Sequence, residues 1–119
     1  MSRFWAAALG AVIFLGACAS ASFVDKVTIV NGTPYSANVD VTGKQRDGWL
    51  GLNTVEPQST ATFDQVIDQG EVWVFRFDYI GKYQQEVEVS RSKLEENDWT
   101  VEVPESFEHR LGEMGVPPP

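Results

Sequence analysis

The sequence predicts an all-β fold, a single antiparallel β-sandwich of about seven short strands followed by a short C-terminal helix. Three observations support this prediction. Apolar and polar residues alternate through most of residues 24–103, turn-forming residues interrupt them at intervals of roughly 8–12 residues, and no long helical pattern separates the alternating segments. The chain has 119 residues and is 43% hydrophobic, which suits one ordered domain.

The first four strands are expected at residues 26–30, 35–42, 49–55 and 60–66. Residues 31–34, Asn-Gly-Thr-Pro, separate the first two strands because they favour turn conformations. The second strand alternates most clearly. Its apolar face consists of Tyr35, Ala37, Val39 and Val41. We expect the first strand at an exposed edge of the sandwich, where it could accept a partner strand.

The longest apolar stretch, residues 72–79, is expected to form the central strand of the fold. Its aromatic residues share one face of the strand, as period-2 alternation requires. These residues are Trp73, Phe75, Phe77 and Tyr79. A tight connection at residues 80–82 then predicts a hairpin with a partner strand at residues 83–89.

A single helical turn is expected between the sixth and seventh strands. Ser92 and Glu95 have the spacing of a capping box, which predicts a turn that begins at Ser92 and ends near Asn97. The last strand is then expected at residues 99–103, and Pro104 ends it.

The C-terminal segment, residues 104–119, predicts a short amphipathic helix with a proline-rich end. Phe107, Leu111 and Met114 are spaced at i, i+4 and i+7, so they share one helix face. Because so short a helix is marginal in water, this apolar face must pack against something. Two alternatives stay open, the protein's own sandwich or a partner protein, and the three residues are therefore candidate binding residues.

The strand number and spacing resemble those of immunoglobulin-like and fibronectin-like sandwiches. The resemblance concerns the architecture alone, because the chain has one cysteine and so lacks the inter-sheet cysteine pair of antibody domains. A six- or seven-stranded barrel is the alternative fold.

The N-terminal segment has the pattern of a secretory signal. Arg3 precedes an uncharged apolar stretch that is long enough for a signal peptide and too short to span a bilayer. The stretch ends in Leu15, Gly16, Ala17 and Cys18. This motif resembles the lipobox of bacterial lipoproteins. The resemblance implies cleavage before Cys18 and a diacylglyceryl group on its sulfur, and hence an exported protein anchored by lipid to the cell membrane or the outer membrane.

These features divide the chain into four parts. Residues 1–17 are expected to be a lipoprotein signal peptide, 18–23 the lipidated cysteine and a tether, 24–103 the sandwich, and 104–119 the helix and proline-rich end. The alternative for the first part is an ordinary signal peptide that happens to contain a cysteine.

Composition and motifs disfavour several classes of function. The net charge is −8 and no basic run occurs, which argues against nucleic-acid binding. The single histidine, His109, has no neighbouring nucleophile or metal-ligand pattern. The acidic residues around Asp64, Asp68 and Glu71 lack the spacing of a calcium loop. We therefore expect no enzymatic activity, no metal and no cofactor.

The sequence instead predicts a membrane-tethered lipoprotein that binds or supports another component of the cell envelope. The alternatives are a secreted protein that binds a small ligand or a carbohydrate, and an inhibitor of an envelope enzyme. Trp49, at the start of a strand, is the best candidate for an exposed aromatic that could stack on a sugar ring. Arg46 and Asp47, in the polar loop at residues 43–48, are candidates for an exposed inhibitory loop.

Overall fold

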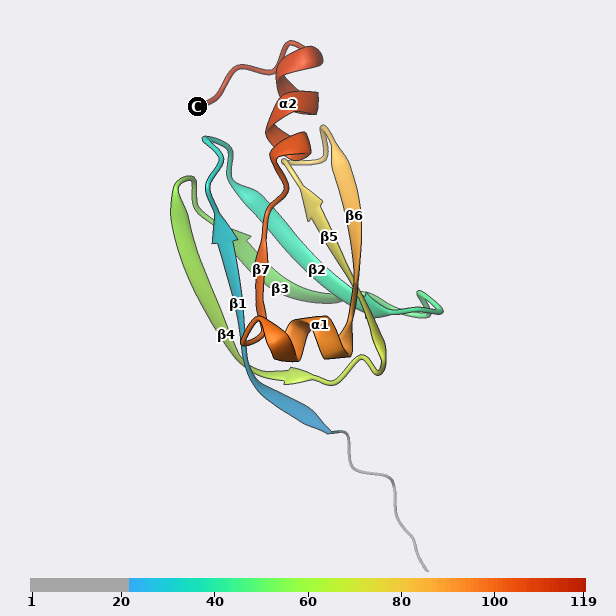
Figure 1. Ribbon diagram of the computed structural model, residues 1–119. Helices are drawn as coiled ribbons and strands as arrows, with labels where there is room; N and C mark the ends of the chain where they lie inside the picture. The colour runs from blue at the N-terminus through green and yellow to red at the C-terminus, as the bar shows by residue number, and fades with distance from the viewer. Residues whose placement is uncertain (1–21) are drawn as a thin grey trace, which may run out of the picture.

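Two packed β-sheets form the body of the protein in a computed structural model that describes residues 22–119 (Figure 1). The strands and helices are β1 (Phe23–Asn31), β2 (Ala37–Gly43), β3 (Leu50–Val55), β4 (Ser59–Ile67), β5 (Val72–Asp78), β6 (Gln84–Ser90), α1 (Arg91–Glu96), β7 (Thr100–Glu102) and α2 (Glu105–Glu113). One sheet has the order β4-β1-β7 and the other the order β3-β2-β5-β6. The predicted β-sandwich with a short C-terminal helix is confirmed.

The strand order matches part of the immunoglobulin architecture. Strands β3-β2-β5-β6 correspond to C′-C-F-G, and the neighbouring β1 and β4 correspond to B and E. Two expectations were wrong. β7 pairs with β1 in parallel, so the sandwich is not purely antiparallel. In addition, β1 lies between β4 and β7, so residues 26–30 are not an exposed edge.

The core lies between the two sheets and is centred on β5. Trp73, Phe75 and Phe77 are fully buried, and Tyr79 is nearly so, which confirms the predicted central strand and its apolar face. The Trp73 ring packs edge-on against Trp99, with 5.3 Å between the ring centroids. Strand alternation therefore places large aromatic side chains where they cover the most apolar surface.

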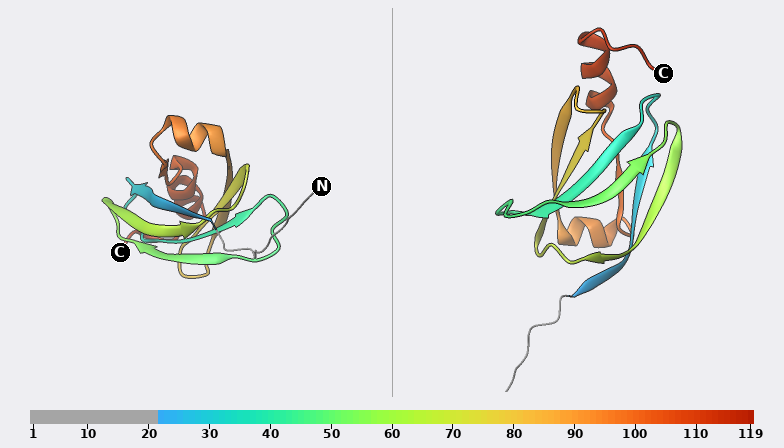
Figure 2. Two further views of the ribbon diagram at one scale, coloured as in Figure 1. Left: turned by 90° about the horizontal axis from the view of Figure 1, so that it is seen from below. Right: turned by 180° about the vertical axis from the view of Figure 1, so that it is seen from behind.

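The helix α1 closes the end of the sandwich where β1 begins (Figures 1 and 2). Its N-cap is Ser90, whose hydroxyl accepts a hydrogen bond from the Lys93 amide at 3.2 Å. The prediction that Ser92 begins the turn was therefore wrong by two residues. Leu94 is buried beneath the helix and fixes which side of it faces the core.

The helix α2 lies at the opposite end and packs on the sandwich itself. Phe107 and Leu111 are fully buried, whereas Met114 follows the last helical residue and is 47% exposed. The helix ends early because Gly115 adopts φ +78°, which turns the chain back so that Val116 packs beside the core in place of Met114. The Tyr35 hydroxyl donates to the Val116 carbonyl at 2.6 Å and holds this turn in place.

Candidate binding surface

The loop between β2 and β3 folds back over the outer face of the β3-β2-β5-β6 sheet. Thr42 donates a hydrogen bond to the Gly48 carbonyl. Thr42 and its cross-strand partner Val74 are buried on this outer face. Gly43 approaches the next connection so closely that a Cβ there would lie 2.9 Å from the Gln69 carbonyl oxygen. The hydrogen bond from Thr42 and the close packing of Gly43 on Gln69 therefore hold the base of the loop in place.

Arg46, a predicted binding residue, reaches from this loop to β6. Its guanidinium forms ion pairs with Glu86 at 3.1 Å and with Glu88 at 2.9 Å. The hydrogen bond with Glu88, and then that with Glu86, raises the pKa of Arg46 above its ordinary value. The Arg46 backbone has φ +56°, a left-handed conformation that turns the loop sharply. Arg46 is thus engaged within the domain, while the neighbouring Asp47 is exposed.

Trp49 is half-buried, so it is less exposed than the sequence suggested. The guanidinium carbon of Arg76 lies 3.9 Å from the centroid of the Trp49 ring, a cation–π contact. Arg76 also pairs with Asp40 at 3.1 Å. A sugar ring would have to displace the Arg76 guanidinium in order to stack on this face of Trp49.

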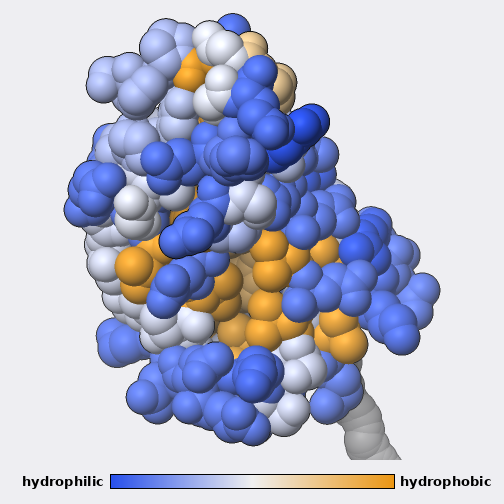
Figure 3. Space-filling model, turned by 45° about the horizontal axis from the view of Figure 1, so that its top comes forward, coloured by the Kyte–Doolittle hydropathy of each residue, from blue (hydrophilic) through white to orange (hydrophobic). Residues whose placement is uncertain are grey.

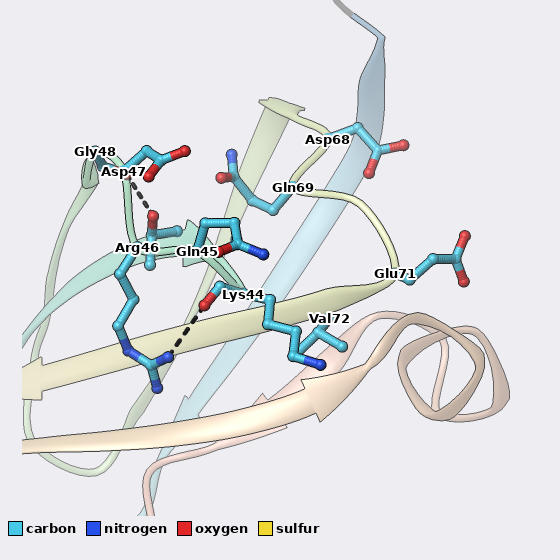
Figure 4. A pocket seen from close by; sticks show the side chains of 11 residues that line it. Lys44, Gln45, Arg46, Asp47, Gly48, Asp68, Gln69, Glu71 and Val72 are labelled. Carbon is cyan, nitrogen blue, oxygen red and sulfur yellow. Dashed lines mark hydrogen bonds between the residues drawn. The ribbon is translucent and has the colours of Figure 1, made fainter.

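A shallow hollow of about 410 Å³ lies between the 43–48 loop and the β4–β5 connection (Figure 4). Gln45 and Gln69 lie in the middle of this view, and the carboxylates of Asp47, Asp68 and Glu71 lie well apart from one another. Within residues 22–119, no group of three His, Cys, Asp or Glu side chains lies close enough together to hold a metal ion.

Asp68, at the rim of the hollow, forms the shortest ion pair of the described chain. Both of its carboxylate oxygens accept hydrogen bonds from Arg91 Nη1 at 2.6 Å, and Oδ1 also accepts from the Gly70 amide at 2.8 Å. Burial alone would raise the pKa of Asp68, but the Arg91 and Gly70 hydrogen bonds outweigh it and hold the pKa below its ordinary value. The pair ties the β4–β5 connection to the start of α1.

This pair predicts a loss of stability in acid. A carboxyl with a lowered pKa in the folded state stabilises the fold above its unfolded pKa, and this contribution is lost as the pH falls through the folded value. We expect the free energy of unfolding to decrease once the pH is lower than about 4, and we expect Asp68 to account for roughly 1 kcal/mol of that decrease. Urea titrations of the wild type and Asp68→Asn between pH 7 and about pH 2 measure it. If the two curves stay parallel down to acid pH, the pair contributes nothing; Asp47→Asn, at an exposed carboxyl, is the control.

The strand edges of the two sheets differ in regularity. Leu52 is an extra residue in the pairing of β3 with β2, where the register shifts. Gln65 in β4 has φ +55° and lies at a gap in the pairing with β1. Such irregularities protect an edge from further pairing. By contrast, β6 pairs with β5 over its whole length without a register shift, and β5 is its one strand neighbour in the described chain.

The structure thus brings one predicted residue, Arg46, to an edge strand that the sequence analysis did not single out. Phe107 and Leu111 are packed on their own sandwich, and Cys18 lies outside the described residues. His109 is an exposed helix residue, 3.1 Å from Glu113. The regular alternation of β6 was visible in the sequence, but its position at a sheet edge was not.

Comparison with known proteins finds no match among protein-family models, curated proteins or solved structures. Among the helices that the structure describes, none is both long enough and apolar enough to cross a membrane.

Proposed function

We propose that the protein is an exported lipoprotein, anchored to a membrane through lipid on Cys18, whose sandwich binds another component of the cell envelope without catalysis. The anchor is inferred from the signal-like segment and from the lipobox that contains the only cysteine. The binding role is inferred from the sandwich and its regular free edge at β6.

The observation that carries this proposal is the lipobox around Cys18, and the place where the chain enters the fold then sets the orientation of the anchored domain. β1 begins at the end of the sandwich closed by α1, and α2 lies at the opposite end (Figure 1). From Cys18 to Phe23 the chain can span at most roughly 17 Å. A lipid on Cys18 would therefore hold the α1 end close to the bilayer and direct α2 away from it.

The side chains at the α1 end fit this orientation. Phe23 and Ile67 are opposite each other in the β1–β4 pairing, and both are large exposed apolar residues. An exposed apolar pair is costly in water and favourable at a lipid interface. Away from this end, Arg76 pairs with Asp40 on the outer face of the β3-β2-β5-β6 sheet.

The test is the intact mass of the detergent-extracted full-length protein, compared with Cys18→Ala. The proposal expects a chain that begins at Cys18 and carries acyl mass, and it expects the mutant to lack that mass. An unmodified mature chain in both samples would overturn the anchor and would make the protein a freely secreted domain.

A further inference from the structure

We propose that the free edge of β6 binds an extended segment of a partner protein by strand addition, and that this segment alternates basic with apolar residues. The inference rests on the proposed binding function, because it names the partner's chemistry, but it does not depend on lipid at Cys18. Four features of the described residues support it.

The first feature is a set of backbone groups on the free edge. The Tyr79 amide donates to the Tyr83 carbonyl at 3.0 Å, and the Arg91 amide donates to the Glu71 carbonyl at 2.8 Å. These bonds mark both ends of the β5–β6 pairing as hydrogen-bonded pairs, and such pairs alternate along an antiparallel ladder. The amides on the free edge are therefore those of Gln84, Glu86, Glu88 and Ser90, the last of which also caps α1.

The second feature is the side-chain surface beside that edge. Val87 and Val89 point toward the core but remain half-buried, because β6 and β7 are the terminal strands of different sheets and no strand lies between them in the described chain. Figure 3 shows apolar surface in this region, framed by hydrophilic side chains, between α2 above and α1 below. Apolar side chains of an added strand would cover this surface.

The third feature is a frame that fits a short strand. At one end, Gln85 Nε2 donates to the Ser106 hydroxyl of α2 at 2.7 Å, and at the other end β6 runs directly into α1. An added strand alongside β6 would lie about 4.8 Å away and would be confined between the two helices. This geometry selects an extended segment of about seven residues rather than a helix or a folded domain.

The fourth feature is charge. Glu86 and Glu88 lie on the outer face of β6 and share a single cation, Arg46, so one negative charge is left over. Directly opposite side chains on neighbouring strands are about 5 Å apart, and opposite charges at that distance attract. Basic residues on the outer face of an added strand would meet these glutamates.

The same charges disfavour a second copy of this chain as the occupant. A two-fold symmetric contact would pair β6 antiparallel with itself. Consider the registers that pair most of β6 and keep its apolar residues on one face. In each of them a glutamate of one copy lies opposite a glutamate of the other: Glu86 opposite Glu88, Glu86 opposite Glu86, or Glu88 opposite Glu88. Like charges directly opposite each other are destabilising, so a basic partner strand is favoured.

The test uses the full-length protein in detergent and a fluorescently labelled short peptide of alternating lysine and valine, with binding followed by anisotropy. We expect the lysine peptide to bind at least about tenfold more tightly than the same peptide with glutamate in place of lysine. We also expect N-methylation of the peptide's backbone amides along one edge, the edge that pairs with β6, to abolish binding, because methylated amides cannot donate hydrogen bonds. Equal binding of the lysine and glutamate peptides would overturn the proposal. So would two methylated lysine peptides, one methylated along each edge, that both still bind.

Two matched variants separate the backbone edge from the charge. Glu88→Pro removes one free-edge amide but leaves the bonds to β5, a position where an edge strand tolerates proline. Glu88→Thr removes the same charge and retains the amide. We expect the lysine peptide to lose about tenfold or more affinity with Glu88→Pro and only about threefold with Glu88→Thr, at unchanged melting temperature of the threonine variant.

The outcomes also distinguish this inference from the proposed function. Equal affinity of Glu88→Pro and Glu88→Thr for the peptide would contradict strand addition. A wild-type dimer that Glu88→Pro dissociates would instead make a second copy of this chain the occupant of the β6 edge and would overturn the basic partner segment. If the wild-type chain carries no acyl mass but binds the peptide, this inference is retained and the anchor is overturned. A lipidated chain that binds no peptide would retain the anchor and remove this inference.

Discussion

Phe107→Ala is expected to lower the free energy of unfolding by about 3–5 kcal/mol, because it leaves a cavity beneath α2. Phe107 is fully buried, and its ring lies 5.9 Å from that of Tyr83, centroid to centroid. Leu111, one turn later, is fully buried beside the same core. The apolar face that the sequence left available to a partner is thus part of the protein's own core.

Urea denaturation followed by tryptophan fluorescence measures this effect, since Trp73 lies in the core. Met114→Ala is the matched control, because Met114 comes from the same predicted helix face but is half exposed; its effect should stay within about 0.5 kcal/mol. Equal and small losses for the two variants would mean that the C-terminal segment does not pack on the sandwich in solution.

Asn31→Ala is expected to lower the free energy of unfolding by about 3 kcal/mol or more, because it leaves several buried polar groups without partners. Asn31 is 1% exposed. Its Nδ2 group donates to the carbonyls of Tyr35, Val55 and Glu56 at 2.7, 3.2 and 3.1 Å, and its Oδ1 accepts from the Thr33 amide at 3.0 Å. One side chain therefore joins the β1–β2 connection to the end of β3.

Thermal and urea unfolding of Asn31→Ala, with Gln45→Ala in the exposed 43–48 loop as the control, test this role. Asn31→Asp provides a sharper comparison. It retains the acceptor for Thr33 but turns a carboxylate toward the carbonyl oxygens, so we expect it to be at least as destabilising as alanine. If Asn31→Ala unfolds like the control, these hydrogen bonds contribute nothing net to stability.

Local structure was largely predictable because it depends on neighbouring residues. Alternation along residues 72–79 and 35–42 set which side chains face the core. The connection predicted at residues 31–34 occurs at residues 32–36, because Asn31 is still part of β1. The errors occurred where two local signals compete. Ser90 and Ser92 are both able to cap α1, and only the position of the Lys93 amide decides between them.

The candidate binding surface was predictable only in part. The polar loop containing Arg46 was identified, but its ion pairs with Glu86 and Glu88 join residues about 40 positions apart in the chain. Trp49 was expected to be exposed because it follows a loop, yet Arg76 from another strand covers one face of its ring. Both misjudgements concern contacts between strands that are distant in sequence.

The sequence by itself determined the strands, their buried faces and the short C-terminal helix, because period-2 and period-3.6 patterns of apolar residues decide which surface must leave water. The tertiary structure decided the order and direction of the strands. It placed β7 parallel to β1, enclosed β1 between two strands and left β6 at a regular edge. The hydrophobic effect is not directional, so it buries an apolar face without selecting a neighbouring strand. Which strand edges stay free depends on hydrogen-bond pairing between segments distant in sequence, and a local pattern does not specify that pairing.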